Sequence, residues 1–361
     1  MLDNLKYLKY LPALIKKDRI SEVTFFITDI CNMKCKHCFV LDALNKKLPL
    51  LSPDEIRKMG KFVTPVQRVH VGGGEPFTRK DLHEVIEAIA ETWDPGVICI
   101  PTNGWFTDRI LEFIDYYGKK GKGSIRIHFS INSPYPEDMD QFTTLKESFK
   151  KWKDSITKAI EAAKKYKNIT IVALATYNEY NQNVFKELID YLHQEIKVPD
   201  FSFQIARTHE KYNPDLDYQR FKEVNNYYFD NYNTQDAFIS SFRKLSREKS
   251  VSYFENPVFK KECTSGKLRV VVSPTGDVYP CEKLGYPNLK EMNKWLLGNI
   301  RDFNYNLNEL VASTSASACY NKICSSKCHC DHNIDQSLSL LSDKKHRKEL
   351  LRETLKKVIK K

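Results

Sequence analysis

Three cysteines near the start of the chain, Cys31, Cys35 and Cys38, have the spacing C-x3-C-x2-C directly after a short apolar segment at residues 23–28. Thiolates at this spacing on one compact loop can hold three irons of a cubane iron–sulfur cluster and leave the fourth iron without a protein ligand. An open coordination position can bind a substrate or cosubstrate, as it does in catalytic metal sites. For the triplet alone, a structural zinc loop or three unrelated thiols are the alternatives.

A glycine-rich stretch, Gly72–Pro76 with the sequence GGGEP, follows a second apolar segment at residues 68–71. Glycines let a backbone approach a ligand closely. Backbone carbonyls and the carboxylate of Glu75 supply acceptors for an ammonium group. Taken alone, the stretch could be a simple turn.

The cysteine triplet and the glycine-rich stretch that follows one strand later together resemble the radical S-adenosylmethionine (radical SAM) superfamily. The resemblance implies a [4Fe-4S] cluster on Cys31, Cys35 and Cys38, with S-adenosylmethionine bound to the open iron. It further implies reductive cleavage to a 5'-deoxyadenosyl radical, which removes a hydrogen atom from a substrate, and an electron donor such as flavodoxin or ferredoxin.

The same resemblance implies a binding site for S-adenosylmethionine. In this family the amino group of S-adenosylmethionine contacts the glycine-rich stretch. Its other parts contact polar side chains that follow later strands, and its adenine contacts the ring of the residue before the third cysteine. For Asn103 an Asn-Gly turn is the alternative, and for His37 a solvent-facing histidine. The catalytic groups on the substrate side stay unknown. The residues implied in cosubstrate binding are His37, Gly73, Gly74, Glu75, Pro76, Asn103, Ser130, Asn132 and Arg207.

Apolar segments that alternate with helical patterns must position these residues. The segments at 23–28, 68–71, 97–101, 125–131, 169–176 and 201–206 are predicted strands, and helices are predicted from Ser52 and over 80–93, 108–117, 154–166 and 184–191. Such alternation predicts an α/β fold with a parallel sheet covered by helices. Six units suit a partial (β/α)6 TIM-like barrel, the usual fold of the superfamily, with its chemistry at the C-terminal ends of the strands. Cys99, inside the third strand, is expected to be a buried structural thiol.

A second group of cysteines begins at Cys263. Residues 269–280 form a predicted hairpin about a Pro-Thr-Gly-Asp turn, and Gly276 precedes Cys281 by four intervening residues. This pattern, with Leu-Gly-Asn-Ile at 297–300, resembles the SPASM/twitch extensions of radical SAM enzymes. The late spacings x4, x3 and x1 depart from the full SPASM pattern, C-x2-C-x5-C-x3-C. A four-cysteine zinc site is the alternative. The resemblance favours one auxiliary [4Fe-4S] cluster, ligated by Cys263, Cys281 and two of Cys324, Cys328 and Cys330.

The charge and composition of the chain limit the kinds of partner that it can have. The net charge is +11, and residues 1–20 and 343–361 carry most of the excess. Such ends are either solvated helix faces or a surface for an acidic peptide, a phosphorylated substrate or anionic lipid. No nucleic-acid module is recognisable. The absence of an 18-residue apolar stretch and of a signal peptide predicts a cytoplasmic protein, with peripheral membrane contact as an option.

Five regions are predicted: an amphipathic helix in 1–20, interrupted or ended near Pro12; the barrel at 21–210; a helical connection at 211–260; the auxiliary cluster domain at 261–332; and a basic helix at 333–361. The substrate is predicted to be a peptide or small molecule, although no leader-binding domain is recognisable. The alternatives are a lipid or sugar precursor at the membrane surface, or a non-catalytic iron–sulfur or zinc scaffold.

Overall fold

The computed structural model describes residues 9–16, 19–121, 123–206, 215–232, 236–255, 263–290, 292–326 and 333–359. Arg207, Cys328 and Cys330 therefore lie outside the described residues. The strands are β1 Glu22–Thr28, β2 Arg68–Gly73, β3 Val97–Thr102, β4 Ile125–Ser130, β5 Ile169–Tyr177, β6 Phe201–Ile205, β7 Arg269–Val272, β8 Asp277–Tyr279 and β9 Gly298–Asn299. The α-helices are α1 Leu11–Lys16, α2 Pro53–Val63, α3 Leu82–Thr92, α4 Thr107–Lys120, α5 Pro136–Thr143, α6 Ser148–Ala163, α7 Phe185–Gln194, α8 Tyr218–Asn231, α9 Ala237–Glu255, α10 Leu307–Ala312, α11 Thr314–Ser325, α12 Asn333–Ser342 and α13 Lys344–Ile359.

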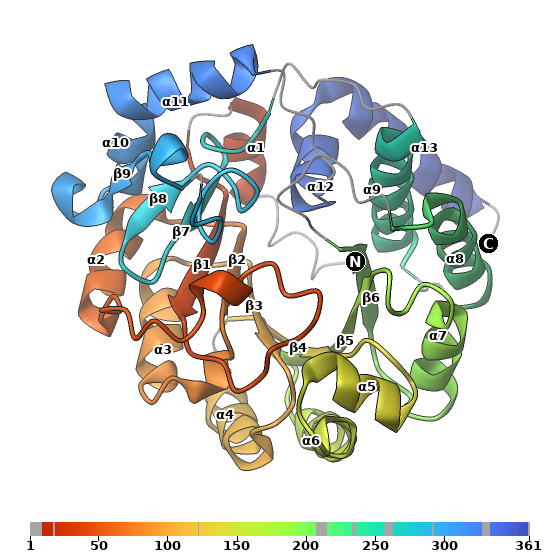
Figure 1. Cartoon of the computed structure of the whole chain (residues 1–361). Coiled ribbons are helices and arrows are strands. Elements are labelled where there is room, and N and C mark those ends of the chain that lie inside the picture. Colours follow the sequence, from red (N-terminus) through yellow and green to blue (C-terminus); the bar gives the residue numbers. More distant parts are fainter. Residues whose placement is uncertain are drawn as a thin grey trace.

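The first six strands are parallel neighbours in chain order and curve inside a ring of helices (Figure 1). The sheet order is β6-β5-β4-β3-β2-β1-β7-β8-β9, and the sheet does not close. The predicted partial (β/α)6 barrel is confirmed. Because all six strands run the same way, their C-terminal ends lie at one edge of the sheet, and this edge carries the predicted site.

Side-chain alternation gives each strand an apolar outer face and a more polar inner face. In β1, the side chains of Val23, Phe25 and Ile27 are fully buried and share one core with Met59 of the covering helix α2. The intervening residues, such as Glu22, point to the inner face. The outer face therefore holds the helices in place, while the inner face is free for polar contacts.

The hairpin of β7 and β8 continues the same sheet. β7 pairs in parallel with β1, with Arg269 opposite Glu22, and β8 returns antiparallel to β7 around Gly276. Gly276 has a φ of +91°, which favours glycine in this predicted turn. The hairpin between Cys263 and Cys281 thus adjoins β1, the strand that precedes the first cysteine group, and the domain boundary at residue 260 stays a prediction.

Helix α2 begins with the predicted capping box. Ser52 Oγ accepts a hydrogen bond from the backbone N–H of Glu55, and the Glu55 carboxylate accepts one of 2.9 Å from the N–H of Ser52. The other carboxylate oxygen accepts a 2.7 Å hydrogen bond from Arg301 Nε. Glu55 therefore joins the start of α2 to the segment that follows β9.

The C-terminal helices form a unit of their own beside α8. Helices α9, α12 and α13 contact one another around the buried side chains of Leu245, Leu340 and Leu350. Leu338 of α12 also packs with Leu14 of α1. Among the described residues, no helix is both long and apolar enough to cross a membrane.

Two local predictions need correction, and a third is tested only in part. The described N-terminal helix, Leu11–Lys16, does not end at Pro12, because proline is tolerated in the first helical turn, where N–H groups have no intrahelical partner. An interruption near Pro12 stays a prediction, since residues 1–8 lie outside the described residues. The basic segment after residue 332 holds two described helices instead of one. Helix α5 was not predicted, and α6 begins at Ser148, six residues before the predicted start. Asp140 of α5 explains that start, since it accepts hydrogen bonds from the N–H groups of Glu147 and Phe149.

Candidate active site

The three cysteines of the triplet lie half-buried on the loop that follows β1. Burial raises the pKa of Cys31 to about 11 and that of Cys35 to about 12, and the neighbouring thiols add to the second shift. Burial also raises the pKa of Cys38. All three thiols are therefore protonated at neutral pH unless a cationic group binds them. Iron would supply the positive charge that stabilises the thiolates.

Within the described part of the chain, no three His, Cys, Asp or Glu side chains form a group that could hold a single metal ion.

Backbone hydrogen bonds hold the cysteine loop on two sides. The N–H groups of Lys34 and Lys36 donate to the carbonyls of Thr143 and Phe142, at the end of α5, at 3.3 and 3.0 Å. On the other side, the Asn45 side chain accepts a 3.1 Å hydrogen bond from the N–H of Cys31. Neither contact was predicted, since no sequence signal connects these segments.

The glycine-rich stretch lies directly against the same loop. The N–H of Gly74 donates to the carbonyl of Thr28 at 3.0 Å, and that of Glu75 to the carbonyl of Ile30 at 2.8 Å. A Cβ on Gly73 would lie 1.9 Å from Thr28 O, and one on Gly74 would lie 2.0 Å from Ile30 O. Glycine is therefore required at both positions because the backbone of β1 and the cysteine loop comes so close. From the sequence, we had attributed this requirement to a bound ligand.

Glu75 is buried and connects the ends of β2 and β3. Its carboxylate accepts hydrogen bonds from the N–H of Phe77 at 3.1 Å, the hydroxyl of Thr102 at 3.0 Å and the N–H of Asn103 at 2.6 Å. Burial nevertheless raises the pKa of Glu75 to about 7. A carboxylate offers about four acceptor sites, so one position remains for an ammonium donor.

The side chain of Asn103 reaches from the end of β3 to the cysteine loop. Its amide Nδ2 donates a 2.8 Å hydrogen bond to Asn32 Oδ1, and its Oδ1 accepts from the N–H of Trp105 at 3.0 Å. Asn103, a predicted cosubstrate-binding residue, therefore also positions Asn32, the residue next to Cys31.

The remaining described candidates lie around the same edge. Ser130 is the last residue of β4, and Asn132 follows it with only 5% of its surface exposed. The ring of His37 lies 4.8 Å from that of Phe142, measured between centroids. Burial lowers the pKa of His37 to about 4, so the imidazole is neutral at pH 7.

Several buried polar atoms at this edge lack a hydrogen-bond partner among the described residues. They are both carboxylate oxygens of Asp29, Asn32 Nδ2, His37 Nδ1 and Asn132 Oδ1. Buried polar groups are nearly always paired in native proteins. A polar ligand with both donors and acceptors, as S-adenosylmethionine is, would satisfy such atoms, so the residues present fit this cosubstrate.

A polar network lies lower on the inner face of the sheet. Cys99 of β3 lies between His70 of β2 and His128 of β4, and His70 Nε2 lies 3.0 Å from Glu22 Oε1 of β1. Burial opposes ionisation of the Cys99 thiol, but the two imidazoles lower its pKa well below the usual value. Cys99 is buried as predicted, yet it belongs to a polar cluster. The alternation of Glu22, His70 and His128 with apolar neighbours was the available signal.

An apolar cluster connects the two cysteine groups. Tyr279 and Tyr286, from the segment around Cys281, pack with Phe26 of β1, and Cys31 and Cys38 lie against this cluster. It shields one side of the triplet from water.

The described cysteines of the second group differ in burial. Cys281 is 8% exposed, whereas Cys263 and Cys324 are half-buried. Cys319, outside the predicted ligand set, is buried on α11. The ligand set of an auxiliary cluster stays a prediction, because Cys328 and Cys330 lie outside the described residues.

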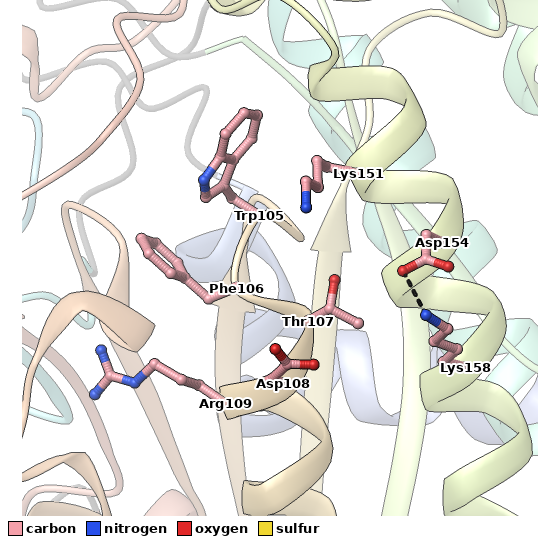
Figure 2. A pocket seen from close by; sticks show the side chains of 8 residues that line it. All are labelled: Trp105, Phe106, Thr107, Asp108, Arg109, Lys151, Asp154 and Lys158. Atoms are coloured by element: carbon pink, nitrogen blue, oxygen red, sulfur yellow. Dashed lines mark hydrogen bonds and ion pairs between the residues drawn. The ribbon is translucent and has the colours of Figure 1, made fainter.

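A pocket of about 350 Å³ lies between the start of α4 and α6 (Figure 2). Charged side chains line most of it, including the ion pair of Asp154 and Lys158 at 2.9 Å. Its lining contains none of the predicted cosubstrate residues, so we do not assign it to that site.

Residues 25–197 match the sequence model of the Radical SAM superfamily. This match covers just under half of the chain and identifies a radical SAM domain, for which the family implies a [4Fe-4S] cluster and S-adenosylmethionine. A GTP 3',8-cyclase of Syntrophomonas wolfei is 26% identical over 184 residues, which cover 50% of this chain and 53% of the cyclase. The chain spans about half the length of this relative.

Solved structures extend the similarity of the fold to most of the chain. The structure of anSMEcpe with bound AdoMet has a TM-score of 0.60 at 17% identity and covers 94% of this chain and 97% of its own. The structure of Streptococcus suis SuiB bound to precursor peptide SuiA has a TM-score of 0.62 at 16% identity and covers 88% and 70%. At such identities the similarity shows a shared fold.

Proposed function

We propose that the chain is a radical SAM enzyme that cleaves S-adenosylmethionine reductively and uses the 5'-deoxyadenosyl radical to remove a hydrogen atom from its substrate. When bound at Cys31, Cys35 and Cys38, the cluster supplies the electron for this cleavage, received from a donor such as flavodoxin or ferredoxin. The supporting observation is the joining of the cysteine loop, the glycine-rich stretch and Asn103 by hydrogen bonds at one edge of the parallel sheet. Clustered cysteines suit the reducing cytoplasm, where we place the protein.

The chain's own residues bind and orient the cosubstrate in this proposal. The free acceptor position of Glu75 and the carbonyls of Gly73–Pro76 bind its amino group. Ser130, Asn132 and Asn103 contact its polar parts, and the neutral His37 ring covers the adenine, since an uncharged imidazole can stack on it. Arg207 pairs with its carboxylate.

An auxiliary [4Fe-4S] cluster is part of the proposal. Cys263, Cys281 and two of Cys324, Cys328 and Cys330 would hold it. The support is the hairpin of β7 and β8: Cys281 follows Tyr279, the last residue of β8, by two residues, and Tyr279 belongs to the apolar cluster that contacts Cys31.

We favour a peptide over GTP as the substrate. The similarity to GTP 3',8-cyclase covers only about half of each chain. The fold similarity to SuiB, which was solved with its precursor peptide, covers 88% of this chain. Most of the chain therefore has its fold counterpart in a protein that was solved with a bound peptide, which supports a peptide as the substrate.

Anaerobic reconstitution with iron and sulfide, followed by reduction in the presence of S-adenosylmethionine, tests the reaction class. We expect 5'-deoxyadenosine from the native protein and none from Cys35→Ala. About eight irons per chain are expected for two cubanes, and about four after Cys263→Ala with Cys281→Ala. Zinc in the purified protein together with no 5'-deoxyadenosine would refute the proposal.

Adding GTP to the active enzyme tests the substrate. We expect the rate of 5'-deoxyadenosine formation to be unchanged and GTP to be recovered intact. Conversion of GTP, coupled to 5'-deoxyadenosine in equal amounts, would overturn the preference for a peptide while leaving the reaction class intact.

A further inference from the structure

The exposed face of helix α13 combines apolar and cationic side chains. Leu351, Leu355 and Val358 are 57%, 59% and 56% exposed, the highest values among the large hydrophobic side chains that the structure describes. They follow Lys344 and Lys348 at spacings of three and four residues, so the five side chains form one stripe along the helix. An unpartnered apolar stripe of this kind is unusual on a folded protein and marks a contact surface.

The carboxylates of α13 are turned away from this stripe. Glu349 is half-buried and pairs with Lys249 of α9 at 3.0 Å, and Glu353 is half-buried and pairs with Lys356 at 2.6 Å. In contrast, Lys344, Lys345, Lys348 and Arg352 are exposed and have no ion-pair partner among the described residues. The outer face of the helix is therefore uniformly cationic around its apolar stripe.

The start of α9 extends the apolar surface. Phe238 and Ile239 are 43% and 40% exposed in the first turn of α9. The next residue, Ser240, accepts a hydrogen bond from Lys357 of α13, so the start of α9 adjoins the C-terminal part of α13. Figure 1 shows α9 and α13 side by side at the edge of the molecule. Glu248, an exposed acid of α9, is 3.8 Å from Lys244.

We propose that this surface, formed by the exposed faces of α13 and the start of α9, docks on a lipid bilayer that contains anionic lipids. A helix with aliphatic residues at its centre and lysine and arginine around them suits the boundary between head groups and acyl chains. The negative surface of such a bilayer attracts each exposed cation. The helix is held in place by Leu350 against Leu245 and Leu340, so its binding face is formed before docking.

The geometry favours a bilayer over a protein partner. Protein contacts concentrate their affinity in aromatic and arginine anchors that enter pockets. Here three aliphatic side chains project from one convex helix between lysines, which matches a fluid surface without pockets. The proposal concerns where the protein acts and does not depend on the radical chemistry.

Co-sedimentation of the full chain with vesicles tests the proposal. The probes are vesicles of phosphatidylcholine alone and vesicles with about one-third phosphatidylglycerol. We expect binding at least about tenfold stronger to the anionic vesicles, and weaker at high salt because screening removes the attraction between charges. Equal binding to both kinds of vesicle, or no binding to either, would overturn the proposal.

Two surface variants and two matched controls locate the contact. Leu351→Ser with Leu355→Ser and Val358→Ser removes the stripe, and Lys344→Glu with Lys348→Glu and Arg352→Glu reverses its charge. Each should weaken vesicle binding by about tenfold or more with an unchanged melting temperature, because all six side chains are exposed. The controls, Phe62→Ser with Leu289→Ser and Lys153→Glu with Lys164→Glu, change exposed residues elsewhere and should bind as the native chain does.

The same variants exclude other occupants. If the native chain dimerises in solution and the triple serine variant is monomeric, a second copy covers the surface and the proposal is wrong. If both surface variants bind anionic vesicles as the native chain does, the lipid contact is elsewhere and the proposal is equally wrong.

Discussion

The side-chain amide of Asn103 donates a 2.8 Å hydrogen bond to the side-chain oxygen of Asn32. Asn103 follows the third strand, whereas Asn32 lies within the cysteine loop, directly after Cys31. The backbone N–H of Asn103 is bonded to Glu75 at 2.6 Å. One asparagine thus connects the cysteine loop, the glycine-rich stretch and the end of β3, so the three motifs move as one unit.

Replacing Asn103 with leucine should loosen the cysteine loop. The loss of the contact with Asn32 removes the hydrogen bond that joins the side chain next to Cys31 to the end of β3. Partners that orient the ligands of a metal typically change metal affinity by about 10- to 100-fold when lost. We expect reconstituted Asn103→Leu to lose iron to a chelator correspondingly faster, measured by the decay of cluster absorbance.

Asn231→Leu is a matched control, because the Asn231 amide is exposed and, within the described part of the chain, bonds to Tyr227 of its own helix alone. Its iron loss should equal that of the native protein. If Asn103→Leu keeps its iron equally well, the contact with Asn32 does not stabilise the cluster site.

Gly74→Ala should be strongly destabilising, whereas Gly72→Ala should be tolerated. The added Cβ at Gly74 would lie 2.0 Å from Ile30 O, while at Gly72 the nearest atom is a ring carbon of Phe26 at 3.7 Å. Overpacking typically lowers the free energy of unfolding by about 1–3 kcal/mol. At Gly74 the obstructing atom belongs to the backbone, which cannot move aside as a side chain can, so we expect a loss at the upper end of this range or beyond. Urea unfolding of the protein without cluster measures both effects. Equal free energies of unfolding for the two variants would contradict the close approach of the two loops.

Glu55→Gln should lower stability at neutral pH but not in acid. Burial acts to raise the Glu55 pKa, but hydrogen bonds from Ser52 and Arg301 outweigh it and lower the pKa to about 2. A carboxyl group whose pKa is lower in the folded than in the unfolded state stabilises the fold fully at pH values above the unfolded-state pKa. This stabilisation is lost as the pH falls through the folded-state pKa. We expect a difference of about 1–2 kcal/mol at pH 7 that shrinks from about pH 4.5 toward pH 2.

Thermal or urea unfolding across this pH range gives the difference between native protein and variant. Glu147→Gln is the control, because the ion pair of Glu147 with Lys150 is mostly exposed and contributes little. A difference for Glu55→Gln that stays constant from pH 7 to pH 3 would show that charge plays no part in it.

Cys99→Ser should cost less stability than Cys99→Val, although valine is the better apolar replacement. Serine keeps a hydrogen-bonding group between His70 and His128, whereas valine leaves both imidazoles without it. A buried polar group that loses its partner costs about 1–3 kcal/mol. The free energies of unfolding in urea decide the order, and a more stable Cys99→Val would show that Cys99 acts as an apolar core residue.

Local patterns predicted the barrel well. The six strands show period-two burial or continuous apolar runs, and Ser52 with Pro53 and Glu55 predicted the start of α2 because a capping box is complete within four residues. The hairpin at Gly276 was also predictable from a short stretch of sequence. Its turn needs a positive φ, which glycine adopts readily. Elements that depend on distant groups were missed. Helix α6 begins where Asp140 of another helix accepts its N–H groups.

The sequence by itself predicted a radical SAM domain, through the spacing of Cys31, Cys35 and Cys38 and the glycine-rich stretch after β2, because each of these signals is complete within a few residues. Only the tertiary structure decided that Gly73 and Gly74 serve the cysteine loop, that Cys99 lies between two histidines, and that Leu351 and Leu355 face solvent. The physical reason is that close approach, pairing and burial are relations between segments far apart in the chain. These contacts and this burial arise only when the strands and helices pack against one another.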